Sequence, residues 1–128
     1  MQSQAAAMVR ASSRTSARAD SDHEFVHLCR NTVAALVVKR RCSVHDVATA
    51  IGLHRRTLNR RLATHGTSVA SLVNEVKVEL ARRMLADTGM LLSEIAEALN
   101  IAHAATLTRL FQRETGHTPS AWRKHALR

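Results

Sequence analysis

The chain has 128 residues, with 19 lysines and arginines against 10 aspartates and glutamates, and a formal net charge of +9 at pH 7. A charge this far from zero in a short chain indicates a polyanionic partner, either nucleic acid or an anionic membrane surface. Phe25, Phe111 and Trp122 are the only aromatic residues, which argues against proteins that stack single-stranded bases on aromatic side chains.

The composition excludes a disulfide framework and a membrane span. Cys29 and Cys42 are the only cysteines, too few for a disulfide-rich secreted domain and in keeping with a reducing cytosol. No apolar run approaches the roughly 18 residues that a transmembrane helix needs. One proline, four glycines and abundant alanine, leucine and arginine favour an all-α fold. We therefore expect a cytoplasmic, all-helical protein of one or two small domains.

Residues 1–20 show no sustained period and are rich in serine and alanine. This composition predicts a disordered tail or an interdomain linker, followed by a folded domain over residues 21–128. Because the segment contains arginines, an alternative is a basic arm that contacts DNA phosphates. The composition also resembles a transit peptide, but flexible linkers have the same composition.

A capping box at Ser21 and Glu24 predicts the start of the first helix. The apolar residues after it recur at helical spacing and are expected to form one stripe: Phe25, Leu28, Cys29, Thr32, Val33 and Leu36. Because Cys29 lies within this stripe, we expect a buried thiol rather than a reactive one.

Residues 43–66 predict two short helices joined by a tight turn. A capping box at Ser43 starts the first helix, and Gly52 ends it, because glycine adopts a positive φ at little cost. The second helix runs from about 54 to 64 and ends at Gly66. The inner face of the pair is expected to comprise Val44, Val47, Ala48, Ile51, Leu58 and Leu62.

Residues 68–87 form the longest periodic run, and at 1.5 Å per residue this helix would span roughly 30 Å. Its expected apolar face comprises Val69, Leu72, Val73, Val76, Leu80, Met84 and Leu85. A second short pair follows over residues 92–116, with Leu107, Leu110 and Phe111 inward. Proline at the first helical position predicts a last helix from Thr118-Pro119, with Trp122 as a core anchor.

The second pair repeats the first. Residues 44–53, VHDVATAIGL, match residues 92–101, LSEIAEALNI, and the TLNR at 57–60 matches the TLTR at 106–109. Each pair therefore has the pattern of a helix-turn-helix, in which the second helix enters the major groove of DNA. The long helix between them approaches the roughly 34 Å that separates successive major-groove faces.

The outward-facing residues of each second helix are the candidate DNA contacts. Arginine can bind guanine with two hydrogen bonds and asparagine can bind adenine likewise, whereas flanking cations more often meet phosphates. The predicted base contacts are Arg56, Asn59 and Arg60 in the first unit and Thr108 and Arg109 in the second. The predicted backbone contacts are Arg55, Arg61, His103, Gln112 and Arg113. The outward face of the second unit otherwise offers only Ala104 and Ala105, which cannot hydrogen-bond to bases through their side chains. We therefore expect most base readout in the first unit.

At this point the chain resembles the DNA-binding domain of AraC/XylS-type bacterial transcription regulators, over about residues 25–126. The stretches that carry the resemblance are VATAIGLHRRTLNRRLATHGTS, VELARRMLADTG, SEIAEALNI and TLTRLFQRETGHTPSAWR. The resemblance implies a seven-helix fold with two helix-turn-helix subdomains, and activation through contact with RNA polymerase. Two departures from the family pattern are Asn100-Ile101 in place of Gly-Phe, and Leu91 in place of a small polar N-cap.

Most such regulators carry a separate effector-binding and dimerising domain ahead of this one. The chain is therefore expected to be either a stand-alone regulator or the reader of a longer one. A monomer would suffice for this domain, and a dimer could form through a missing N-terminal domain.

The sequence thus favours a sequence-specific regulator, an activator, that binds double-stranded DNA in the bacterial cytoplasm and nucleoid. We expect no enzyme activity and no cofactor. His23 and His27 are four residues apart, but no acidic or cysteine partner completes a metal site. The alternatives left open are a nonspecific nucleoid-associated DNA binder and an anti-activator that acts through protein contacts.

Overall fold

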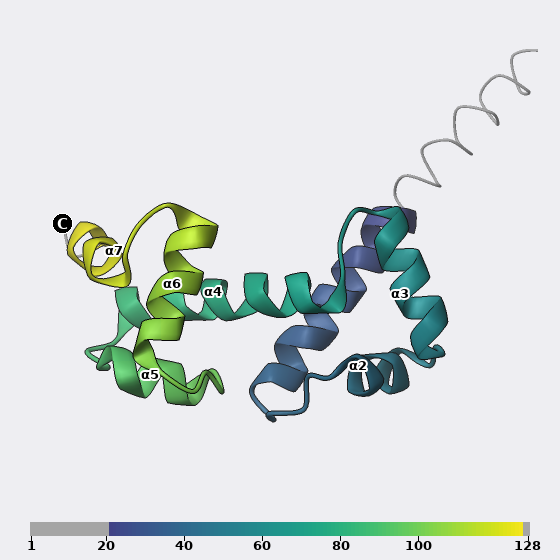
Figure 1. Cartoon of the computed structure of the whole chain (residues 1–128), viewed down its shortest axis with the longest axis horizontal. Coiled ribbons are helices and arrows are strands. Elements are labelled where there is room, and N and C mark those ends of the chain that lie inside the picture. Colours follow the sequence, from purple (N-terminus) through teal and green to yellow (C-terminus); the bar gives the residue numbers. More distant parts are fainter. Residues whose placement is uncertain (1–20, 127–128) are drawn as a thin grey trace, which may run out of the picture.

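A computed structural model describes residues 21–126, and every helix or strand element in that range is an α-helix (Figure 1). Residues 21–37 are helical, and six helices follow: α2 (Val44–Ile51), α3 (Arg55–Thr64), α4 (Val69–Asp87), α5 (Leu92–Ala98), α6 (Ala104–Thr115) and α7 (Pro119–Ala126). The predicted all-α class with two helix-turn-helix units is confirmed. The predicted tail, residues 1–20, lies outside the described residues.

The long helix α4 lies between the two units, as Figure 1 shows. The first helix, α2 and α3 gather at its N-terminal end, and α5, α6 and α7 gather at its C-terminal end. It packs against α2 on one side and against α6 and α7 on the other. With 19 residues it is about 28 Å long. One straight helix therefore contributes to the core of both units.

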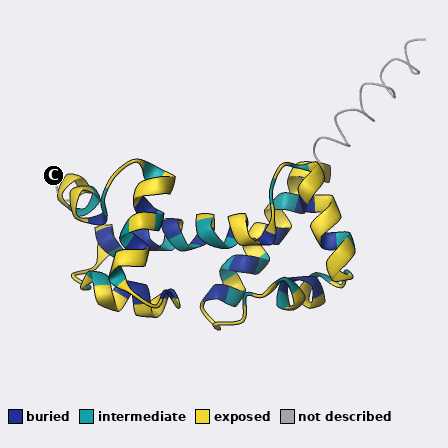
Figure 2. Cartoon of the chain, in the orientation of Figure 1, coloured by how far each residue is buried: buried dark blue, intermediate teal, exposed yellow. Residues whose placement is uncertain are grey.

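The buried face of α4 changes sides midway along the helix. Its buried residues are Val69, Leu72, Val76, Val78, Ala81 and Leu85 (Figure 2). At about 100° per residue, the first three lie on one face and the last three on a face roughly 180° away. The single apolar face predicted from the sequence is therefore incomplete. It omitted Val78 and Ala81, and its Val73, Leu80 and Met84 are only partly buried against the core. The reason is that the two units pack on opposite sides of the helix.

The helix ends lie close to the predicted positions. At the start of α2, the Ser43 hydroxyl accepts the Asp46 N–H at 3.0 Å, and the Asp46 carboxylate accepts the Ser43 N–H at 3.1 Å. Hydrogen bonds from Ser43, the hydroxyl first, hold the pKa of the Asp46 carboxyl below its ordinary value. Gly52 ends α2 with φ 82°, and Gly116 ends α6 with φ 78°. The glycine stops and the Ser43 cap are thus confirmed.

The first helix differs from its prediction in two respects. Ser21 is already helical, whereas an N-cap residue has non-helical dihedrals, so the predicted capping box does not start this helix. Leu28 is 50% exposed, although it was expected in the buried stripe. The buried residues follow a narrower line at every fourth position, which keeps the predicted Phe25, Cys29 and Val33 and adds Val37. Burial raises the pKa of the Cys29 thiol, as expected for an inert cysteine.

Arg123 of α7 holds the connection between α4 and α5. Its Nε donates to the carbonyl of Leu85 at 3.1 Å, and its Nη2 donates to the carbonyls of Thr88 and Met90 at 3.3 and 2.7 Å. The last carbonyls of a helix have no partner within the helix, so a guanidinium at this place satisfies several acceptors together. Beside it, Trp122 packs edge-to-face on the buried Phe111, with 5.9 Å between ring centroids.

Arg61 links α3 to the first helix. Its guanidinium carbon lies 3.7 Å from the centroid of the Phe25 ring, and Phe25 is almost fully buried. A guanidinium over an aromatic face is attracted by the electron-rich ring. Arg61 therefore contributes to packing within the first unit.

We expect Arg123→Ala to lower the free energy of unfolding by roughly 1–3 kcal/mol, because three backbone carbonyls lose their donor. Urea denaturation followed by circular dichroism would measure the change. Lys124→Ala is the control, since this exposed neighbour removes the same charge without touching those carbonyls. Equal stability of the two variants would contradict the role given to Arg123.

We also expect Arg61→Ala to lower the free energy of unfolding by about 0.5–1 kcal/mol through loss of the contact with Phe25. Arg60→Ala is the matched control, because Arg60 is exposed and lies one residue before Arg61 on the same helix. The same urea titration compares the two variants. A loss of similar size in both would indicate that removal of charge, and not the ring contact, sets the stability.

Candidate nucleic-acid interface

The turn between α2 and α3 fixes the direction of α3. Gly52 and Leu53 each donate their N–H to the carbonyl of Ala48 at 2.9 Å, which closes the end of α2. His54 then caps α3, with its Nδ1 accepting the N–H of Arg56 at 3.3 Å. This cap requires a neutral imidazole, because Nδ1 must carry a lone pair. The sequence prediction placed His54 at the helix start but did not identify it as the cap.

Two leucines fix the rotation of α3 about its axis. Leu58 and Leu62, one turn apart, are both fully buried. The opposite face is therefore turned outward, and it carries four exposed polar residues: Arg55, Arg56, Asn59 and Arg60. A hollow of about 440 Å³ at the start of α3 is lined by Val44, His54, Arg55, Arg56 and Asn59. The structure thus brings the three predicted base-contacting residues of the first unit together on one exposed helix.

The arginines on this face differ from those elsewhere in their partners. In the described part of the chain, no ion pair forms at Arg55, Arg56 or Arg60. By contrast, Arg30 pairs with Glu75 at 2.9 Å. The positive charge of α3 is therefore not neutralised within residues 21–126. Arg61, the other predicted phosphate contact of α3, lies over Phe25 and is thus positioned by packing.

The second unit forms the same turn with different residues. Asn100 takes the left-handed conformation, with φ 57°, that Gly52 takes in the first unit. Asparagine tolerates this conformation better than most residues, so the turn is retained despite the departure from Gly-Phe. Leu91 cannot cap α5 with its side chain, but its N–H donates to the Glu94 carboxylate at 3.0 Å. Half of the usual capping box therefore remains.

The outward face of α6 carries less charge than that of α3. Leu107 and Phe111 are fully buried, and Ala105, Arg109, Gln112 and Arg113 are exposed. Thr108 is partly buried, and its hydroxyl donates to the carbonyl of Ala104 at 3.1 Å. Arg113 lies 3.7 Å from the carboxylate of Glu114. His103 is the N-cap residue of α6, without a side-chain cap bond. Of the two predicted base contacts of this unit, Arg109 is thus the more exposed, and its Nη2 donates to the Thr106 hydroxyl at 3.4 Å.

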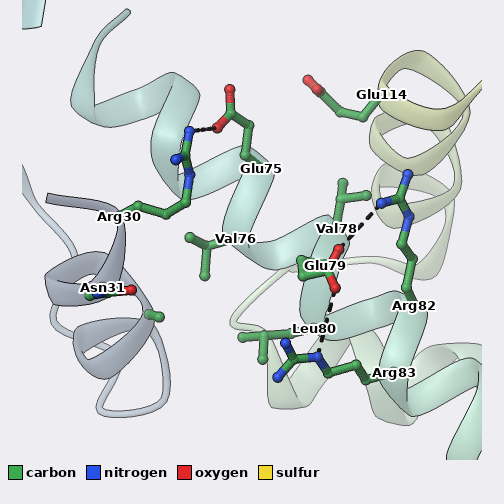
Figure 3. Close-up of a pocket in the computed structure, with 11 residues that line it drawn as sticks. Arg30, Asn31, Glu75, Val76, Val78, Glu79, Leu80, Arg82, Arg83 and Glu114 are labelled. Carbon is green, nitrogen blue, oxygen red and sulfur yellow. Dashed lines mark hydrogen bonds and ion pairs between the residues drawn. The ribbon is translucent and has the colours of Figure 1, made fainter. Parts of the chain in front are cut away.

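A second kind of surface follows the middle of α4, where side chains line a hollow of about 540 Å³. Figure 3 shows these side chains. Glu79 accepts ion pairs from Arg82 at 3.2 Å and from Arg83 at 3.7 Å, and the Arg30–Glu75 pair lies nearby. Positive and negative charges are matched here. This surface therefore lacks the net charge that a polyanion requires.

Residues 21–126 hold neither a membrane-spanning helix nor a metal-binding cluster. No helix there is both long and apolar enough to cross a bilayer. No three histidine, cysteine or acidic side chains in that range are grouped closely enough to hold a metal ion.

Comparisons with known proteins agree with this geometry. A family model described as a helix-turn-helix domain matches residues 47–125. The regulator VirS of Mycobacterium tuberculosis is 36% identical over 84 residues, which are 66% of this chain and 25% of that protein. The transcriptional activator NphR of a Rhodococcus species is 27% identical over 86 residues, or 67% of this chain and 26% of that protein. The chain thus spans about a quarter of the length of these relatives.

The fold is also found among solved structures. A transcriptional regulator of Chromobacterium violaceum, described as containing an AraC-type DNA-binding domain, superposes with a TM-score of 0.70. The sequence identity is 21%, and the match covers 86% of this chain and 96% of that one. Together with the family model, which matches more than half of the chain, this likeness agrees with the arrangement of α2–α3 and α5–α6 about α4. The chain belongs to the AraC-type helix-turn-helix family of DNA-binding transcription regulators.

Proposed function

We propose that the protein recognises a specific double-stranded DNA sequence by inserting α3 and α6 into successive major grooves. The observation that carries this proposal is the exposed face of α3, where Arg56, Asn59 and Arg60 lie together and the arginines have no ion-pair partner among residues 21–126. Arginine and asparagine are the side chains that bind guanine and adenine edges with two hydrogen bonds. The length of α4, about 28 Å, is close to one turn of B-DNA.

Within this proposal the two units contribute unequally. Base contacts come from Arg56, Asn59 and Arg60 on α3. On α6 they come from Arg109, with a smaller part for Thr108, whose hydroxyl is already engaged by the Ala104 carbonyl. Phosphate contacts come from Arg55, Arg61, His103, Gln112 and Arg113. Helix α4 is somewhat shorter than the distance between successive major grooves. Bending of the DNA would make up the difference, at a cost of about 1–6 kcal/mol.

We further propose that binding activates transcription through contact with RNA polymerase. The support for this step is the likeness to NphR, which is named a transcriptional activator. One chain carries two readers, so a monomer suffices for binding, and dimerisation would come from a domain outside this sequence.

Selection of bound duplexes from a random DNA pool should enrich one motif, with two conserved blocks about one helical turn apart. Footprinting on the enriched duplex should then protect two zones with the same separation. Recovery of unselected sequences, together with equal affinity for all duplexes at each salt concentration, would instead identify a nonspecific DNA binder.

On the selected site, Arg60→Ala should relax preference at one base pair, a loss of about 1–3 kcal/mol against the best base. Arg55→Ala is the matched variant, since it removes the same charge from a predicted phosphate contact. Arg55→Ala should lower the affinity for all sequences by the same factor. It should also reduce the slope of log affinity against log salt concentration by about one released counterion. Binding titrations against every single-base variant of the site measure both effects. If both variants relaxed the same position, the division between base and phosphate contacts would be wrong.

A further inference from the structure

The end of the first helix approaches the second unit, although Arg40 and Glu97 lie 57 residues apart in sequence (Figure 1). Arg40, just after this helix, donates from Nη2 to the carbonyl of Glu97 in α5 at 3.5 Å. Among the side-chain hydrogen bonds of residues 21–126, this is the one that joins the part of the chain before α4 to the part after it. Arg40 therefore bridges the two readers by a route other than α4.

The backbone at Arg40 carries a second, independent observation. Its φ is 59°, in the left-handed region, and its N–H and that of Arg41 close the helix onto the carbonyls of Val37 and Leu36. Three other stops of this chain with positive φ use glycine: Gly52, Gly66 and Gly116. Arginine at such a position costs free energy, because its Cβ crowds the backbone. Strained residues of this kind persist where the surrounding structure holds them in place, and they cluster at functional positions.

The acceptor of Arg40 is also specially placed. The Glu97 carbonyl lies in the last turn of α5 and accepts the N–H of Asn100 at 3.0 Å. Asn100 is the other non-glycine residue with positive φ in the described chain. Carbonyls at a helix C-terminus carry partial negative charge and attract cations. Arg40 and Asn100 line one hollow of about 530 Å³, which also contains His103 and Ala104 at the start of α6.

We propose that Arg40 is a positioning residue that holds the second reader in the orientation that α4 gives it relative to the first. This inference rests on the proposed function, in which both α3 and α6 engage one duplex. By holding the last turn of α5, Arg40 fixes the turn that leads into α6. The role concerns the spacing between the two contact zones on DNA, and not the identity of any base.

The test compares the wild-type chain with Arg40→Gly and Arg41→Ala. Glycine removes the bridge and also relieves the left-handed strain, so this variant keeps its fold. Arg41 is the next residue, and its side chain is exposed. Arg41→Ala therefore removes the same charge and leaves the bond between Arg40 and Glu97 in place. Affinity is measured for the selected duplex and for duplexes with one or two base pairs inserted between the contact zones.

We expect Arg40→Gly to reduce the ratio of affinities between correct and altered spacing at least threefold, and Arg41→Ala to leave this ratio unchanged. An equal loss in both variants at every spacing would overturn the proposal, since it would mark Arg40 as a simple phosphate contact.

A measurement without DNA separates this proposal from the proposed function. Residual dipolar couplings of the backbone amides report whether the two units share one alignment tensor. We expect one tensor in the wild type and two that differ in magnitude in Arg40→Gly. A single shared tensor in Arg40→Gly would overturn the role of Arg40, whatever the DNA results. Absence of a preferred DNA site in the wild type would instead contradict the proposed function, while the tensors still decide the role of Arg40.

Discussion

The packing of two units onto opposite faces of α4 is the constraint on which the rest of the structure depends. Val69, Leu72 and Val76 are buried on one face toward the N-terminal end of α4, and Val78, Ala81 and Leu85 are buried on the opposite face toward its C-terminal end. Because an α-helix of this length is stiff, the rotation between its two buried faces sets the rotation between the two units. The relative placement of α3 and α6 thus depends on which sides of α4 are apolar. It also depends on the position along α4 at which the buried face changes from one side to the other.

Charge is distributed in a way that separates structural from binding surfaces. Along α4, arginines meet glutamates, as in the contacts of Arg82 and Arg83 with Glu79. On α3, the arginines turn outward without such partners in the described chain. A cation already paired with a carboxylate offers little to a phosphate, whereas an unpaired one retains its full attraction. The unpaired positive charge of the described residues thus includes three arginines on the outward face of α3: Arg55, Arg56 and Arg60.

Features that depend on neighbours in sequence could be predicted, and features that depend on contacts between distant residues could not. The Ser43 cap, the glycine stops and the buried Leu58 and Leu62 follow from local chemistry and helical period. The two faces of α4 were missed because a single stripe was assumed, and Leu28 was misplaced because only a narrow line of the first helix is covered. Contacts of Arg123 with backbone carbonyls, and of Arg61 with Phe25, have no signature in the local sequence. The roles of the proposed base-contacting residues likewise depend on a DNA partner.

The two buried faces of α4 also restrict the insertions and deletions that this protein can tolerate. A residue inserted between Val76 and Val78 would rotate the second unit by about 100° and advance it by about 1.5 Å. Surface loops absorb such insertions readily, because no core depends on their register. In the proposed complex with DNA, one residue added to or lost from α4 would turn α3 or α6 away from the face of the duplex that the other helix contacts. A change in the length of α4 therefore alters the relative placement of both units, whereas a substitution on the exposed face of α3 or α6 leaves the buried core unchanged.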